Sequence, residues 1–117
     1  MGQVGSKRIL VVDDEAVVSN AICDLLRLDG FEVETAASGQ QAIQLCQSCD
    51  FDLIFLDFYL PDMQGDALIT VLRRTNPRQK IIVVSGHRPL PSVPQAEFLI
   101  RKPFTAEVIR KAVARFA

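Results

Sequence analysis

Five side chains able to do chemistry follow short apolar runs of this 117-residue chain. They are three carboxylates, one hydroxyl and one amine: Asp13, Asp14, Asp57, Ser85 and Lys102. Aspartates held close together repel one another and raise each other's pKa, so a positive charge has to compensate. Lys102 can supply that charge, and so can a divalent cation. Because the candidate ligands are carboxylate oxygens without clustered His or Cys, the residue types favour a hard ion, Mg²⁺.

An aspartate beside a bound Mg²⁺ can attack phosphorus and form an aspartyl phosphate. In that chemistry the metal bridges protein carboxylates and phosphoryl oxygens. Lys102 would pair with another phosphoryl oxygen as a point charge, and Ser85 would hydrogen-bond a third. One aspartate after a strand usually caps a turn, but five suitable groups at matching positions predict a site for phosphoryl transfer.

The elements that must position these groups alternate between two hydrophobic patterns. Wholly apolar runs and one alternating run predict strands at 8–12, 31–36, 52–56 and 80–84, with a last strand at 96–100. Helical stripes predict helices at 15–28, at 38–47, around 67–72 ending before 76–77, and over 108–116. Ser38 followed by Gln41 has the spacing of a capping box at the start of the second helix.

Alternating strands and helices predict an α/β fold with a parallel sheet covered by helices on both faces. Ligands of such sheets bind outside the carboxyl ends of the strands. The candidate groups all follow strands, so we expect them to gather at one edge of the sheet.

One interval between strands departs from the pattern. Residues 86–101 number sixteen and must contain the last strand, which leaves too little chain for a helix of average length. Pro89, Pro91 and Pro94 also lie there, and each proline inside a helix costs about 3 kcal/mol. We therefore predict an irregular loop over 87–95. The residues before the prolines should be extended, and either Leu90 or Val93 should fold over the core: the preceding residues are Arg88, Leu90 and Val93.

Four segments together resemble the receiver domains of bacterial two-component response regulators. The matching segments are ILVVDDE (9–15), LIFLDFYLPDMQG (53–65), VVSG (83–86) and KPF (102–104), with the spacing Asp57, Pro61, Gly65. The resemblance implies a doubly wound five-stranded parallel sheet of the flavodoxin/CheY-like (βα)5 type. The short interval at 86–101 adds the expectation that the fourth helix is missing or replaced by a loop. The receiver domain would span 7–117, after an N-terminal tail at 1–6.

The resemblance also implies roles for the site residues. Asp57 would be the phosphoacceptor, with Ser85 as the switch hydroxyl and Lys102 as the phosphate-pairing lysine. Mg²⁺ would be held by Asp14, Asp57 and the backbone carbonyl of Tyr59, with Asp13 acting mostly through water. The peptide bond between Lys102 and Pro103 would be cis.

The same resemblance implies a signalling switch rather than an enzyme for an external substrate. The domain would catalyse only its own phosphorylation and dephosphorylation. Its phosphoryl donor would be a sensor histidine kinase or a histidine phosphotransfer protein. The net charge of −1 and the absence of a long apolar run argue against direct binding of nucleic acid or membrane, and three cysteines suit a reducing cytoplasm. The oligomeric state is left open.

One further position departs from the family. Receivers usually carry an aromatic switch residue three positions before the lysine, where this chain has Leu99, with Phe98 one earlier. Either the strand register shifts by a bulge or the aromatic switch is absent.

Two other functions use similar residues. A haloacid-dehalogenase-like phosphatase also uses an aspartate at a strand end, but it requires a second acid two residues later, where this chain has Tyr59. A receiver-like binding module that never needs phosphate is the alternative, and the complete set of site residues argues against it.

The pair Cys46 and Cys49 has the spacing of a redox dithiol but falls at a helix end, so a packing role is favoured. His87 and Tyr59 lie near the site mouth, either as plain loop residues or as groups that tune water access.

Overall fold

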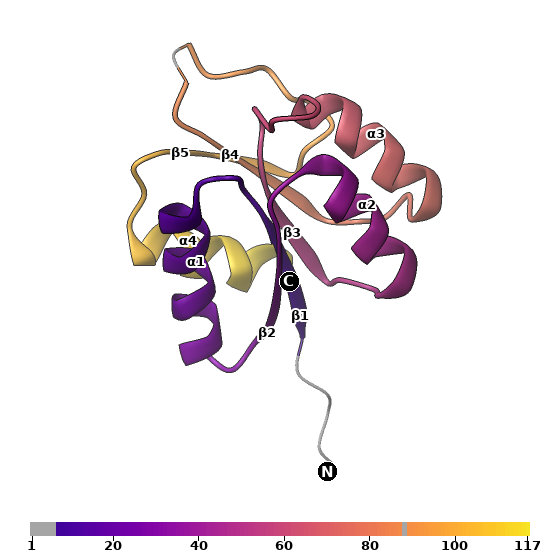
Figure 1. Ribbon diagram of the computed structural model, residues 1–117. Helices are drawn as coiled ribbons and strands as arrows, with labels where there is room; N and C mark the ends of the chain where they lie inside the picture. Colours follow the sequence, from indigo (N-terminus) through magenta and orange to yellow (C-terminus); the bar gives the residue numbers. More distant parts are fainter. Residues whose placement is uncertain (1–6, 88) are drawn as a thin grey trace.

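The computed structural model describes residues 7–87 and 89–117 (Figure 1). Over these residues strands and helices alternate, apart from one interval. The elements are β1 (Arg8–Val12), α1 (Ala16–Leu28), β2 (Glu32–Ala36), α2 (Gly39–Ser48), β3 (Leu53–Asp57), α3 (Gly65–Thr75), β4 (Ile81–Ser85), β5 (Phe98–Arg101) and α4 (Ala106–Phe116). The tail predicted at 1–6 and the extended backbone predicted for Arg88 lie outside the described residues.

All strands pair in parallel, in the order β2-β1-β3-β4-β5. This confirms the doubly wound α/β fold. β3 and β4 each end one residue later than the apolar runs predicted, so Asp57 and Ser85 are the last residues of their strands. The last strand begins two residues later than expected, at Phe98.

The two faces of the sheet bury alternate residues of each strand. The first face packs against α1 and α4, and Ile9, Phe55 and Ile82 point to this face. The second face packs against α2 and α3, and Leu10, Leu56 and Val83 point to this face. Figure 1 shows the two pairs of helices on opposite sides of the sheet.

The interval between β4 and β5 contains no helix in its described residues, 86–87 and 89–97. We call this segment the proline strap. Val93 and Ala96 pack against the second face, beside Leu99 of β5. The predicted irregular loop is confirmed, and Val93 is the residue that folds over the core.

Local signals in the sequence account for several element ends. The Ser38 hydroxyl accepts the Gln41 N–H at 3.1 Å, and the Gln41 side chain accepts the Ala37 N–H at 2.7 Å. This confirms the predicted cap, with the return bond one residue earlier than in the standard box. Gly30, with φ of +93°, ends α1 in a backbone region that favours glycine. The Lys102–Pro103 bond is cis, as predicted. Over the described residues, no helix has the length and apolar character needed to cross a membrane.

Candidate phosphoryl-transfer site

The order of the strands brings the predicted site residues together. Asp13 follows β1, Asp57 and Ser85 end β3 and β4, and Lys102 follows β5. These four strands are neighbours in the sheet, and all four point their carboxyl ends the same way. The five residues that the sequence singled out therefore meet at one edge, as expected for an open parallel sheet.

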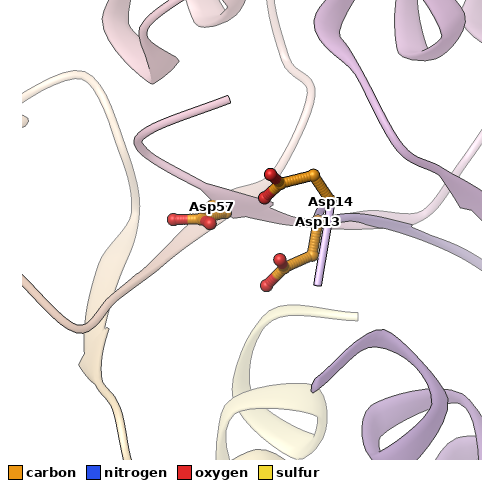
Figure 2. A group of neighbouring side chains, drawn as sticks. All are labelled: Asp13, Asp14 and Asp57. Carbon is orange, nitrogen blue, oxygen red and sulfur yellow. The ribbon is translucent and has the colours of Figure 1, made fainter. Parts of the chain in front are cut away.

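Three aspartates form a group able to hold a metal ion (Figure 2). One carboxylate oxygen from each of Asp13, Asp14 and Asp57 lies within 4.8 Å of the others. Asp13 and Asp57 are buried, whereas Asp14 is exposed. All donors are hard oxygens, so the site suits Mg²⁺ or Ca²⁺ rather than a softer metal.

Lys102 supplies the positive charge opposite this group. Its Nζ lies 2.9 Å from an Asp13 oxygen, 3.1 Å from a Glu15 oxygen and 3.5 Å from an Asp57 oxygen. Glu15 was not assigned a role from the sequence, because its partner lies 87 residues away. The amine is thus shared among three carboxylates and faces Asp57 at the longest of the three distances.

The electrostatics of Asp57 reflect its burial. Desolvation raises the pKa of this carboxyl and the charge of Asp13 raises it further, while Lys102 opposes both. Burial alone would lower the pKa of Lys102, but its bonds and charge interactions with Asp13, Asp57 and Glu15 outweigh burial and raise it. A charged Asp57 is therefore costly with the protein groups alone, and a bound cation would relieve that cost.

Gly86 and His87 line the other wall of the site, directly after Ser85. Ser85 is fully buried, and its hydroxyl oxygen accepts the His87 N–H at 3.3 Å. The His87 ring lies over the Tyr59 ring, with 3.9 Å between centroids. A cavity of about 260 Å³ opens between these groups, lined by Glu15, Asp57, Gly86, His87 and Lys102. It gives a phosphoryl group access to Asp57.

The loop after β3 fixes the backbone around Tyr59. The Leu60 N–H donates to the Met63 carbonyl at 3.2 Å, and the Gly65 N–H donates to the Phe58 carbonyl at 2.6 Å. A Cβ on Gly65 would lie 3.0 Å from the Phe58 Cα, so this close approach favours glycine. The Tyr59 carbonyl, expected as a metal ligand, is thereby carried on a tight turn.

Asp62 ties this loop to the start of α2. Its two carboxylate oxygens accept the Gly39 N–H at 2.8 Å and the Gln40 N–H at 2.9 Å. These two backbone bonds lower the pKa of Asp62. The sequence carried no signal for this contact, because the helix start already had Ser38 as its cap.

β5 settles the arrangement at the switch position. It pairs with β4 residue for residue, with Leu99 opposite Val83 and Phe98 opposite Ile82, so no bulge shifts the register. Leu99 packs on the second face, whereas the Phe98 ring lies 6.0 Å from the ring of Phe116 in α4. The aromatic residue therefore faces away from the side on which the family usually places it.

The two spaced cysteines are placed by packing. Cys46 and Cys49 are free and half-buried against the second face, as the sequence favoured. Desolvation and the neighbouring Cys49 raise the pKa of Cys46 to about 11, which leaves few thiolates at neutral pH.

The fold and site define a class of protein that comparison with known families identifies. The model of the response regulator receiver domain matches residues 9–114. The chain belongs to this family. It is a phosphoaccepting signalling switch, a module rather than an enzyme with an external substrate.

Individual relatives agree with this assignment. A CheY-like receiver domain from Methanospirillum hungatei is 28% identical, with a TM-score of 0.87 over 95% of this chain and 93% of that one. The response regulator TrrA from Thermotoga maritima, solved with Mg²⁺-BeF, is also 28% identical, with a TM-score of 0.86 over 95% and 99%. The cell cycle response regulator CtrA of Brucella ovis is 33% identical over 79 residues, which are 68% of this chain and 34% of that relative. This chain thus matches about a third of the length of that regulator.

Proposed function

We propose that Asp57 is the phosphoacceptor, with Lys102 and Ser85 as its two protein partners. A carboxylate oxygen of Asp57 attacks the phosphorus of a phosphohistidine. The new P–O bond forms as the P–N bond breaks, and the imidazole leaves with the bonding electron pair. The observation that carries this proposal is the buried Asp57 carboxylate in the cavity wall, with the Lys102 amine 3.5 Å away.

The metal ion in this proposal is Mg²⁺, held by Asp13, Asp14, Asp57 and the Tyr59 backbone carbonyl. The oxygen donors of the three aspartates fit such an ion. Burial and the charge of Asp13 raise the pKa of Asp57, so an added cation would favour its charged form. When bound, the ion would neutralise charge on the carboxylate and the phosphoryl oxygens.

Lys102 and Ser85 would bind the phosphoryl oxygens that the metal leaves free. Lys102 would exchange part of its contact with Asp13 and Glu15 for a contact with the phosphoryl group, which brings more negative charge. The Ser85 oxygen accepts the His87 N–H, and this contact leaves the O–H of the hydroxyl able to donate a hydrogen bond to the phosphoryl group. Both residues would thus register phosphorylation without making the bond.

The donor is proposed to be a histidine kinase or histidine phosphotransfer protein that docks beside the cavity. A second hollow of about 460 Å³ adjoins it and shares Glu15 and Lys102 with it. Its other lining residues are mainly apolar: Val17, Val18, Ala21, Pro103 and Phe104. Val17 is 84% exposed, so its apolar side chain is available to a partner. An apolar helix of the donor would cover this hollow and present its histidine to Asp57.

The remaining assignments are also proposals. We take residues 7–117 as the receiver domain, acting in the cytoplasm without binding nucleic acid directly.

Phosphorylation is tested by intact-mass analysis with acetyl phosphate and Mg²⁺. Wild type should gain the mass of one phosphoryl group, and Asp57→Asn should gain none. Asp66→Asn, an exposed aspartate on α3, is the matched control and should be labelled like wild type. Equal labelling of Asp57→Asn and wild type would remove Asp57 from its role.

Metal binding has a built-in reporter, because Tyr59 is the only tyrosine and the chain has no tryptophan. Mg²⁺ should change the tyrosine fluorescence of wild type and leave that of Asp14→Ala unchanged. An identical titration in both proteins would refute the metal assignment.

A further inference from the structure

The proline strap has the sequence of a polyproline II ligand. Its central residues read Pro89-Leu90-Pro91-Ser92-Val93-Pro94, in which two apolar-proline pairs lie three residues apart. Proline fixes φ near −65°, and the residue before it is pushed to extended angles. Residues 90–93 form neither helix nor strand. Polyproline II has three residues per turn, so the two pairs repeat along the same edges.

Burial along the strap follows this repeat. Leu90 and Val93, three apart, are half-buried, and Val93 packs on the second face of the sheet. Pro89, Ser92 and Pro94 are exposed, whereas Pro91 is half-buried. The edge with Leu90 and Val93 therefore rests on the domain, the edge with Pro89 and Ser92 faces outward, and the third edge is exposed at Pro94. Figure 1 shows the strap arching away from the carboxyl end of β4.

Both ends of the strap are held in place. At the start, His87 bonds the Ser85 hydroxyl and lies over the Tyr59 ring. At the end, the Arg73 guanidinium of α3 donates to the Gln95 carbonyl and, at 2.7 Å, to a Glu97 carboxylate oxygen. These anchors lower the entropy that a partner would otherwise have to pay to order the segment.

A turn closes the displayed run. The Ala96 N–H donates to the Val93 carbonyl at 3.1 Å, which puts Pro94 at the second position of a turn, where its fixed φ is favourable. The exposed prolines thus lie on a short, pre-formed segment rather than in a coil.

We propose that the proline strap is the output surface of this receiver, and that its partner is a protein with a groove lined by aromatic side chains. Such grooves bind the edges of a polyproline II segment, because proline rings stack on aromatic faces and the segment is already extended. The strap offers one exposed edge, at Pro89 and Ser92, and the exposed Pro94 at its end, which is the surface that such a groove requires.

The strap is coupled to the site by its first residues. It starts directly after Ser85, whose hydroxyl would turn toward a phosphoryl group on Asp57, and its bond to the His87 N–H would change. If phosphorylation changes the conformation of the strap, a partner that binds one conformation more tightly would bind with an affinity that depends on phosphorylation. This coupling rests on the proposed function, whereas binding to the strap itself does not.

Isolated SH3 and WW domains serve as probes, since both read proline spacing through aromatic grooves. Binding to the purified chain is measured by titration calorimetry, with Mg²⁺ alone and with Mg²⁺ and beryllofluoride. At least one probe should bind wild type, and the double variant Pro91→Ala, Pro94→Ala should bind about tenfold more weakly. Ser92→Ala keeps every proline and should bind like wild type. If thermal melting shows that the double variant is unfolded, Pro94→Ala alone takes its place.

Failure of every probe to bind wild type, or equal binding by the proline variant, overturns the docking proposal. Beryllofluoride should change the affinity of the bound probe at least about threefold. If beryllofluoride binds, seen by Tyr59 fluorescence, and the probe affinity stays the same, the strap is not the output surface. If beryllofluoride does not bind, the proposed function fails, and docking is judged from the Mg²⁺ arm alone.

Discussion

The two faces of one sheet are closed by different kinds of structure. On the first face α4 covers the β5 side with a helical stripe, in which Val113 is 5% exposed. On the second face the proline strap covers the corresponding region, and its Val93 is only half-buried. Val83 of β4 is nevertheless fully buried on that face. The strap thus closes its side of the sheet with less burial than α4 gives the other side, so we expect it to open at lower cost than a helix.

Matched valine truncations should give the largest difference between the faces. Val113→Ala should lower the free energy of unfolding by about 2–3 kcal/mol, because it removes buried methyl groups and leaves a cavity. Val93→Ala should cost about 1 kcal/mol, because its site is half-exposed and can collapse. Urea unfolding of the two variants measures this, and equal losses would show that the strap packs as tightly as the helix.

Removing Arg73, which anchors the strap to α3, should lower the free energy of unfolding somewhat less than Val113→Ala does. Arg73→Ala should cost about 1–2 kcal/mol, because it breaks hydrogen bonds to two carbonyls and removes the ionic partner of the half-buried Glu97. Amide hydrogen exchange in the strap should accelerate while exchange in α4 stays the same.

Arg74→Ala provides the control, since its side chain is exposed and next to Arg73 on the same helix. It should change stability by less than about 0.5 kcal/mol. If both variants leave strap exchange unchanged, Arg73 does not anchor the strap.

Helix caps offer a smaller contrast. Thr105 caps α4 by accepting the Val108 N–H at 3.2 Å, and Thr105→Ala should cost about 1 kcal/mol. Ser38→Ala on α2 should cost only a few tenths of that, because Asp62 still holds two N–H groups at the same helix start. Thermal melting of the two variants checks the order, and a larger loss for Ser38→Ala would contradict the support by Asp62.

The smallest effects concern two exposed carboxylates, one on each face. Asp29 binds Arg110 and joins α1 to α4, whereas Asp62 joins the β3–α3 loop to α2. The bond from Arg110 lowers the pKa of Asp29, and the Gly39 and Gln40 N–H groups lower that of Asp62. A lowered folded-state pKa stabilises the protein above the unfolded value of 3.8, and this contribution is lost as pH falls through the folded value.

The dependence of the free energy of unfolding on pH, at acidic pH, tests the contributions of Asp29 and Asp62. Asp29→Asn and Asp62→Asn should each flatten the loss of wild-type stability below pH about 4, without changing the slope near pH 7. Urea unfolding between pH 2.5 and pH 7, with the variants compared to wild type, measures the slopes. Variant slopes equal to that of wild type throughout would show that these contacts do not form in solution.

Most of the fold and the site composition could be predicted from short segments of sequence. The strand ends were the exception, and they have a physical explanation. Ser85 pairs with Arg101 in the parallel ladder, although neither side chain is apolar, because ladder hydrogen bonds use only the backbone. Glu97 was expected in the last strand, but its carboxylate accepts the Ile81 N–H and binds Arg73, and regular pairing begins at Phe98.

The sequence by itself predicted which acids, hydroxyl and amine gather at one edge of the sheet, and that an irregular segment rather than a helix follows β4. Both follow from near neighbours: apolar runs end where the acids begin, and proline acts on its own backbone and on the residue before it. Only the tertiary structure decided that Lys102 pairs with Asp13 across 89 positions, that Asp62 caps α2 across 23, and that Phe98 turns toward α4. These contacts depend on how whole elements pack against the sheet, and the spacing of residues within one element carries no record of that packing.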